Sequence, residues 1–343
     1  MEHDRAALTA PTHLELRRTL LAPQRVRDLS RLRPDRVARD IALCWGAIVI
    51  AWLGAAAIGR PLVTVAAAAL VGNRFYALFI IGHDGLHRRL HPRQERSDLV
   101  TDLFVMAPIG AITRLNNRNH LLHHQHLATG ADPDRFKHCC FNKRTRLQVV
   151  GYLTSVTSVA TTVAHVFNRG RDDHRDGEVA GLGEPAAVAR RTPRDLALLA
   201  GTQLTLLVGL TLLFGWWGYL LMWWVPVFLF TFLADNLRTF AEHGQLSGDA
   251  EADEHRLITT RPRWLERQLL APMHMNLHAA HHLWPSIPYY NLPQADAELR
   301  ADPRSTSIDE RRSYLAFVWH FARGLPYEGC APEPEAALGG VGA

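Results

Sequence analysis

The residues with the clearest chemical potential are histidines that recur at short, regular spacing. The first group reads His83-Asp-Gly-Leu-His87, and His91 follows four residues later. Side chains four residues apart lie on the same face of an α-helix. The spacing therefore predicts that His83, His87 and His91 point toward one site.

Two later groups each place three imidazoles within a single helical turn. Both have the spacing i, i+3, i+4, and they are His120, His123 and His124 in the first and His278, His281 and His282 in the second. His126 follows the first of these groups, and a separate histidine, His243, lies in the sequence Ala-Glu-His-Gly. We expect each trio to present its imidazoles to one point in space, as the ligands of a metal ion would.

The number of clustered histidines restricts the kind of metal site. Imidazole suits iron, zinc, copper and nickel. Eight or nine clustered imidazoles exceed what one tetrahedral zinc ion can use, whereas a pair of iron ions can use them. A zinc peptidase would carry His-Glu-x-x-His, but Asp84 occupies the second position here. The sequence therefore favours a two-iron centre, with Asp84 orienting a ligand imidazole from behind.

Other reaction types find no support in the motifs. The chain contains no Gly-x-Ser-x-Gly nucleophile motif and neither of the common nucleotide-binding glycine patterns. Its net charge of +5 comes from dispersed Arg residues rather than from a basic segment interleaved with aromatics. Four cysteines are too few for a disulfide framework. We therefore expect no nucleic-acid partner, and metal chemistry is the main hypothesis.

Four apolar stretches position the histidine groups. Each approaches the length of about twenty apolar residues that crosses a bilayer as a helix. They are residues 41–59, 62–81, 196–214 and 219–233. The short connections within each pair predict two antiparallel hairpins. The predicted fold is an all-α integral membrane bundle of four transmembrane helices with a helical cap that holds a di-iron site. Trp216, Trp217, Trp223 and Trp224 are expected near the membrane interface.

The distribution of Arg residues orients this bundle. Arg is frequent in residues 1–40, between residues 82 and 195 and in the C-terminal third, whereas each hairpin turn carries at most one charge. Positively charged segments stay in the cytosol. All histidine groups are therefore expected at the cytosolic face, and we take the membrane to be a bacterial inner membrane. The predicted organisation is a basic cytosolic arm without a cleavable signal (1–40), a membrane domain (41–331) and a disordered tail (332–343).

The three histidine boxes resemble those of the membrane fatty-acid desaturase superfamily. The third box is the most specific, because Arg263-Trp264 and Asn276 precede it and Leu283-Trp-Pro-Ser-Ile-Pro-Tyr-Tyr-Asn-Leu292 follows it. This run is similar to that of the acyl-lipid desaturases, which introduce cis double bonds into membrane fatty acyl chains. The resemblance covers roughly residues 41–293.

The resemblance implies a non-haem di-iron centre with dioxygen as co-substrate. The histidines at the family's ligand positions are His83, His87, His120, His123, His124, His243, His278, His281 and His282. Some members add an Asn that acts through water. Thr239 stands at that position here, and Asn236 and Asn276 are weak substitutes. The residues expected to support the ligands are Asp84, His91, His126 and Asn276.

The resemblance also implies a membrane lipid or another apolar molecule as substrate and an external electron donor, such as a ferredoxin, that docks on the basic surface. Residues 126–134, which include Ala131-Asp-Pro-Asp134, are similar to the corresponding segment of carotenoid ketolases and hydroxylases of the same superfamily. A hydroxylase or ketolase of a carotenoid or other apolar substrate is therefore an open alternative to a desaturase. A non-enzymatic metal-binding or transport protein is a third reading, but polar residues are scarce along the spans apart from Asn73 and Arg74.

Overall fold

The computed structural model describes residues 13–127, 132, 145–156, 191–243 and 257–323, and the predicted tail at 332–343 lies outside them. Within these ranges the chain is mostly helical. Four helical segments are long and apolar enough to cross a membrane. They are α4 (Pro34–Ile58), α5 (Pro61–Leu86), α11 (Pro193–Phe214) and the segment Leu220–His243, which comprises η4 (Leu220–Trp224), η5 (Val227–Phe232) and α12 (Leu233–His243).

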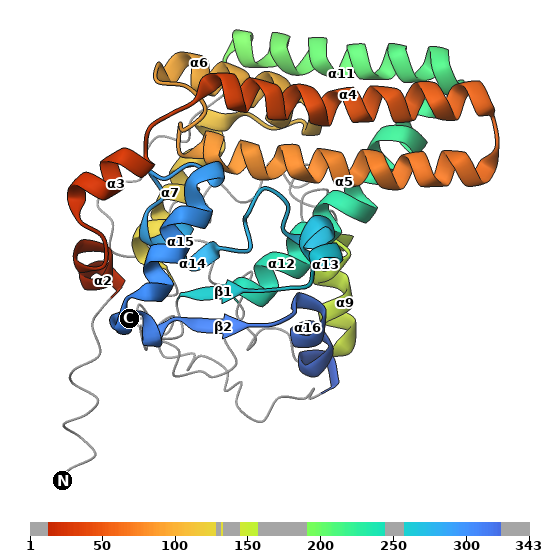
Figure 1. Ribbon diagram of the computed structural model, residues 1–343. Helices are drawn as coiled ribbons and strands as arrows, with labels where there is room; N and C mark the ends of the chain where they lie inside the picture. The colour runs from red at the N-terminus through yellow and green to blue at the C-terminus, as the bar shows by residue number, and fades with distance from the viewer. Residues whose placement is uncertain (1–12, 128–131, 133–144, 157–190, 244–256, 324–343) are drawn as a thin grey trace, which may run out of the picture.

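Three of these helices begin with a proline, at Pro34, Pro61 and Pro193. A proline suits the first helical position because its fixed φ matches the helix and its missing N–H would have no partner there. α11 also has a capping box, in which the Thr192 side chain accepts from the backbone of Asp195 and Asp195 accepts from the backbone of Thr192. Figure 1 shows α4, α5 and α11 as neighbouring long helices with most of the other elements on the α5 side of them.

The helices extend beyond the predicted spans, mainly toward the histidines. α4 begins at Pro34 instead of residue 41, and α5 continues to Leu86 instead of residue 81. The fourth segment continues to His243, ten residues past the predicted end at 233. Apolar composition marks only the part of a helix that meets lipid, whereas contacts within the protein keep the polar ends helical. Through these extensions α5 carries His83 and α12 carries His243 into the site.

An aromatic cluster fills the space between α4, α5 and η4. The Trp223 ring is fully buried, stacks on Trp45 at 5.8 Å and meets Phe75 edge-on at 4.8 Å. Its indole N–H donates to the Pro108 carbonyl over 2.9 Å. Trp223 is therefore not the exposed interface anchor that the sequence predicts, because packing in the core takes up both its ring and its N–H.

Most of the remaining elements lie on the α5 side of the long helices (Figure 1). Before the last membrane segment the remaining elements are α2 (His13–Thr19), α3 (Pro23–Leu29), α6 (Gln94–Thr101), η1 (Asp102–Met106), η2 (Ala107–Ile109), α7 (Thr113–His126) and α9 (Arg146–Leu153). After it come β1 (Ile258–Thr260), α13 (Trp264–Leu270), α14 (His278–Leu283), η7 (Tyr289–Asn291), α15 (Leu292–Ala301), η8 (Pro303–Ser307), β2 (Asp309–Arg311) and α16 (Tyr314–Arg323). The two short strands pair in parallel, with Ile258 opposite Asp309.

The N-terminal helices pack against the third histidine box. Leu16, Leu20 and Leu29 share a buried cluster with Leu283 and its neighbours on α14. The Trp284 indole N–H donates to the Arg17 carbonyl over 3.1 Å. Because α2 and α3 cover α14, the described part of the basic arm contributes to the structure that holds the site.

Candidate metal centre

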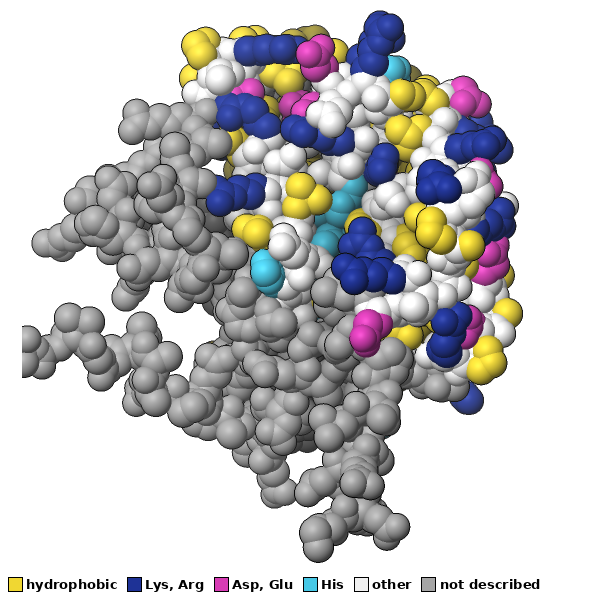
Figure 2. All heavy atoms as spheres, turned by 90° about the vertical axis from the view of Figure 1, so that its left-hand side faces the viewer, with side chains coloured by type: hydrophobic (Ala, Val, Ile, Leu, Met, Phe, Trp, Pro, Cys, Tyr) yellow, Lys and Arg dark blue, Asp and Glu magenta, His cyan; other side chains and the backbone are white. Residues whose placement is uncertain are grey.

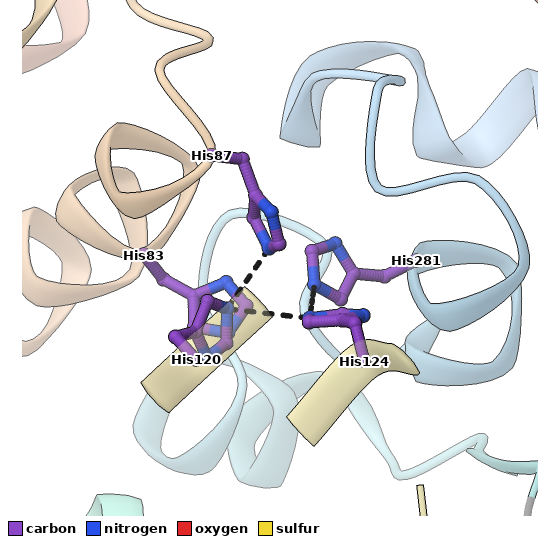
Figure 3. A group of neighbouring side chains, drawn as sticks. All are labelled: His83, His87, His120, His124 and His281. Atoms are coloured by element: carbon purple, nitrogen blue, oxygen red, sulfur yellow. Dashed lines mark hydrogen bonds between the residues drawn. The ribbon is translucent and has the colours of Figure 1, made fainter. Parts of the chain in front are cut away.

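Five histidines from three helices form one compact group, which we call group one (Figure 3). One imidazole nitrogen from each of the five lies within 4.8 Å of the corresponding nitrogens of the others. They are His83 and His87 at the end of α5, His120 and His124 on α7, and His281 on α14. The Nε2 atoms of His87 and His120 are 2.9 Å apart, and the Nε2 atom of His124 lies 3.2 Å from those of His120 and His281.

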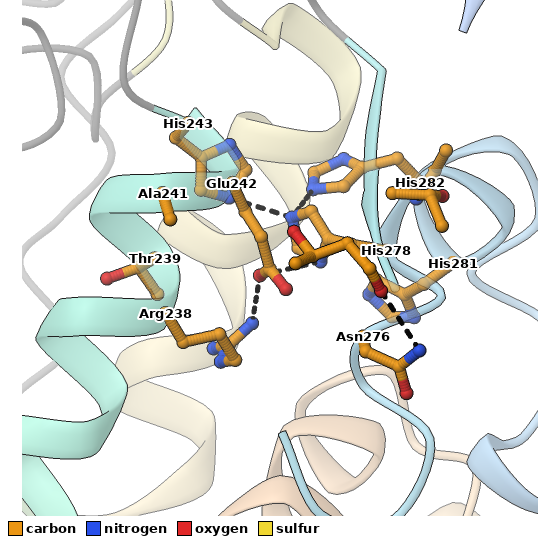
Figure 4. A network of polar contacts seen from close by, with 12 residues as sticks. Arg238, Thr239, Ala241, Glu242, His243, Asn276, His278, His281 and His282 are labelled. Carbon is orange, nitrogen blue, oxygen red and sulfur yellow. Dashed lines mark hydrogen bonds and ion pairs between the residues drawn. The ribbon is translucent and has the colours of Figure 1, made fainter. Parts of the chain in front are cut away.

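Four further histidines form group two beside group one, and Figure 4 labels His243, His278 and His282 of this group. The nitrogens of His123, His243 and His282 lie within 4.8 Å of one another. The Nε2 atom of His278 lies 2.9 Å from that of His243 and 2.9 Å from that of His282. Group two therefore combines α7, α12 and α14. The structure brings together all nine histidines that were predicted to be ligands.

The two groups share helices, and neighbouring residues face different groups. His124 belongs to group one, and its ring stacks on that of His282 in group two at 4.2 Å. The expectation that each trio points to one spot is therefore wrong. Residues four apart lie on nearly the same helix face, but consecutive residues are about 100° apart. Accordingly His123 and His124 diverge, as do His281 and His282.

Burial favours the neutral form of five of the site histidines. Loss of hydration is the largest cause that lowers the pKa of five of these imidazoles well below 6.5, and neighbouring charged groups lower it further; they are His87, His124, His278, His281 and His282. The neutral imidazole is the form that binds a metal ion.

The donor set fits a pair of transition-metal ions. A neutral imidazole has one N–H and one nitrogen lone pair. Several Nε2 atoms lie 2.9–3.2 Å from the Nε2 atom of a neighbouring histidine. In each such pair at most one nitrogen can donate an N–H to the other, so hydrogen bonds within the groups leave some lone pairs without a partner. A cation placed between these nitrogens would accept all of their lone pairs. With five imidazoles in group one and four in group two, each group offers enough nitrogen ligands for one ion of the kind that imidazole prefers.

Two carboxylates lie behind the histidines of group two. The Nδ1 atom of His123 lies 2.9 and 3.0 Å from the carboxylate oxygens of Asp132. The Nδ1 atom of His278 lies 3.3 Å from Oε2 of Glu242, which is fully buried. Sequence reasoning missed Glu242. The signal was a charged pair with i, i+4 spacing, Arg238 and Glu242, immediately before His243.

The residues expected to support the ligands have other contacts. Asp84 accepts a hydrogen bond over 2.7 Å from the backbone N–H of Tyr289, so it connects the first box to the loop after the third. Asn276 donates to the Thr260 carbonyl over 3.1 Å, and the N–H of Thr260 donates to the Asn276 carbonyl over 3.1 Å. Asn276 thereby fixes the start of the third box to β1. His126 ends α7 and lies in neither group.

His91 does not line up with His83 and His87. α5 ends at Leu86, and Arg88 adopts a positive φ of 57°, which turns the chain away from the helix axis. The Nδ1 atom of His91 accepts the backbone N–H of Arg93 over 2.9 Å. The prediction of a shared face for all three residues is therefore wrong.

The two α12 residues considered for a ligand that acts through water, Asn236 and Thr239, are engaged elsewhere. The Asn236 amide donates to the carbonyls of Tyr152 and Leu153 and to the Ser155 hydroxyl, and so attaches α9 to α12. The Thr239 hydroxyl donates to the Asp235 carbonyl over 2.8 Å. These contacts give both residues a role in the packing of α12.

A helical membrane protein with clustered histidines that fit a metal site is the class that these observations define. The family model described as fatty acid desaturase matches residues 59–311, which is most of the chain. The chain belongs to the fatty acid desaturase family, and the protein is therefore an oxidoreductase that acts on an apolar lipid substrate. A search of curated proteins finds no match.

Proposed function

We propose that the protein is a membrane-bound, O2-dependent di-iron desaturase that introduces a double bond into a fatty acyl chain. The observation that carries this proposal is the convergence of nine histidines in two adjacent groups, five in one and four in the other. We propose that group one holds one iron ion and group two the other. Family membership supports the lipid substrate.

The proposed division of labour follows from the chemistry of the substrate. Iron with dioxygen supplies an oxidant strong enough to remove hydrogen from an unactivated methylene, which no side chain can do. The protein's own residues present neutral imidazole lone pairs, fix the directions of two rings through Asp132 and Glu242, and keep bulk water away by burial. His281 and His282 are both at most 5 % exposed.

We further propose that the membrane segments form two hairpins that open to the cytosol of a bacterium, with the cap and its metal centre on that side of the inner membrane. The face in Figure 2 supports a docking site for an external donor. Histidine side chains are visible near its middle, and basic side chains surround them. Such a surface fits a small acidic electron carrier of the ferredoxin kind, since complementary charge guides encounter.

Product analysis tests the proposal. The chain is expressed in an iron-supplied host that lacks the activity, together with a ferredoxin and its reductase, and the lipids are analysed by mass spectrometry. A desaturase gives acyl chains that have lost two hydrogens, and His281→Ala gives none. Lipids or carotenoids that have gained oxygen would instead identify a hydroxylase or ketolase. Lipids unchanged relative to His281→Ala would contradict the proposal.

A further inference from the structure

Glu242 is the centre of a buried polar network that reaches a metal-site histidine (Figure 4). Its Oε2 atom accepts from Arg238 over 2.5 Å and lies 3.3 Å from Nδ1 of His278. Its Oε1 atom accepts from the Tyr314 hydroxyl over 2.9 Å. Glu242 and Tyr314 are fully buried. The carboxylate is thus held from two sides while one oxygen faces the imidazole.

The other side of the network is equally constrained. Arg238 is 3 % exposed and also donates to Asp235 over 2.8 Å and to the Tyr76 hydroxyl over 2.9 Å. The Tyr76 hydroxyl in turn donates to the Leu270 carbonyl over 2.8 Å. The contacts therefore join α5, α12, α13 and α16 around one carboxylate. A buried ion pair of this kind gains little net stability over apolar packing, so its precise geometry needs another explanation.

We propose, on the basis of the proposed function, that Glu242, Arg238 and Tyr314 are positioning residues for the metal ion of group two. The carboxylate, 3.3 Å from the Nδ1 atom of His278, attracts the N–H at that position by its charge and so directs the Nε2 lone pair toward His243 and His282. Arg238 and Tyr314 hold the carboxylate in that orientation. Tyr314, on the last described helix, thereby controls a metal ligand that it does not touch.

The positions of the two carboxylates, Asp132 and Glu242, make the two proposed metal sites inequivalent. Asp132 orients His123, so both carboxylates serve group two. Among the residues that the structure describes, five buried Nδ1 atoms have no hydrogen-bond partner; they belong to His83, His124 and His281 in group one and to His278 and His282 in group two. Of these five, the Nδ1 atom of His278 has a carboxylate oxygen, Oε2 of Glu242, at 3.3 Å. A carboxylate behind an imidazole makes it a stronger ligand, and loss of such a partner typically weakens metal binding by about 10–100-fold. Damage to the network is therefore expected to weaken one site and spare the other.

The test is Co²⁺ titration of the metal-free full-length protein in detergent, followed by visible absorption, for the wild type, Tyr314→Phe and a matched control. Tyr314→Phe removes one hydrogen bond to Glu242 and leaves the ring in place. Tyr289→Phe is the control, because Tyr289 is also buried and donates to a carboxylate, Asp40, over 2.7 Å. We expect the wild type and Tyr289→Phe to bind two ions alike. In Tyr314→Phe we expect the affinity of one Co²⁺ binding step to fall by about 10-fold or more and that of the other step to stay unchanged.

Glu242→Gln extends the test, with the iron content after dialysis against a chelator as a second readout. The variant keeps the side-chain volume and removes the charge, so we expect it to retain about one iron where the wild type retains about two. Equal weakening of both sites, or weakening only together with a loss of helix content, would assign the network a general structural role and overturn the inference. Unchanged Co²⁺ binding in Tyr314→Phe would also overturn the inference, but it would leave the proposed function intact. A wild type that binds fewer than two ions would contradict both.

Discussion

The Nε2 atom of His281 lies 3.2 Å from the Nε2 atom of His124, although 157 residues separate them in the chain. This contact brings α14 against α7 and joins the third histidine box to the second. The rings of both residues also lie within 5.1 Å of the His87 ring, measured between ring centroids. Group one therefore exists only when three distant segments are folded together.

Replacing His281 tests this convergence. We predict that His281→Ala abolishes desaturation and lowers the iron content, because group one loses the only ligand that α14 contributes to it. The affinity loss should exceed the about 100-fold cost of removing an outer partner of a ligand. His320→Ala, an exposed histidine on α16, is the control and should keep activity and iron. Normal iron and product in His281→Ala would remove His281 from the site.

His91 and His87 provide a second comparison within one box. Their spacing in sequence suggests equivalent roles, but His91 caps the N–H of Arg93 outside both groups. We predict that His87→Ala loses iron and turnover. His91→Ala should change the iron content and the turnover by less than about threefold. It should lower the free energy of unfolding by about 1 kcal/mol or less, which is the contribution of one hydrogen bond. Iron analysis and product yield of the two variants decide this. Equal losses would mean that the end of α5 is arranged differently.

Gly85 separates the two α5 histidines and sits against α6. A Cβ atom there would collide with the buried side chain of Thr101. Gly85→Ala should therefore destabilise the fold by about 1–3 kcal/mol and displace the first box. Gly54→Ala is the matched control, since the space beside Gly54 on α4 is open. Thermal unfolding in detergent measures the difference, and equal melting temperatures would contradict the close contact of α5 and α6.

The metal-free protein is predicted to lose stability in acid. The pKa values of five site histidines lie well below 6.5 in the folded state, mainly through loss of hydration; they are His87, His124, His278, His281 and His282. Below pH 6.5 these histidines bind protons in the unfolded chain but remain unprotonated in the folded chain. The free energy of unfolding therefore falls as pH falls.

Each such histidine contributes a slope of up to about 1.4 kcal/mol per pH unit, and above pH 6.5 the contribution is constant. Unfolding of the metal-free protein at pH 7.5, 6.5 and 5.5 measures this slope. It should be smaller in His281→Ala, because one neutral buried imidazole is gone. Equal stability at the three pH values would show that these histidines are not buried in the neutral form.

The sequence predicts the parts of this structure that depend on local periodicity. Apolar runs located the four membrane segments, because lipid contact requires an uninterrupted apolar surface. The i, i+3, i+4 spacing of the second and third boxes identified the histidines that converge. The ends of α4, α5 and the last segment were underestimated, since contacts such as Tyr289 with Asp40 stabilise polar helix ends that apolar composition does not mark.

The remaining errors depend on tertiary structure. His91 has the spacing of a ligand, but the helix stops at Leu86 before reaching it. Trp223 resembles an interface residue in sequence, yet its N–H finds the Pro108 carbonyl in the core. Glu242 could not be recognised as a partner of His278, because α12 and α14 meet only in the folded protein. Spacing within a helix predicts which side chains share a face and not which neighbour that face meets.

The iron content of the active wild-type protein tests the account most directly. The chain is purified from iron-supplied cells, its activity is verified by product analysis, and metals are quantified by mass spectrometry per mole of protein. We predict about two iron atoms per chain, with His123→Ala and His281→Ala each falling to about one or fewer. An active preparation with no iron, or with one iron that neither variant affects, would contradict a two-ion centre built from the nine histidines.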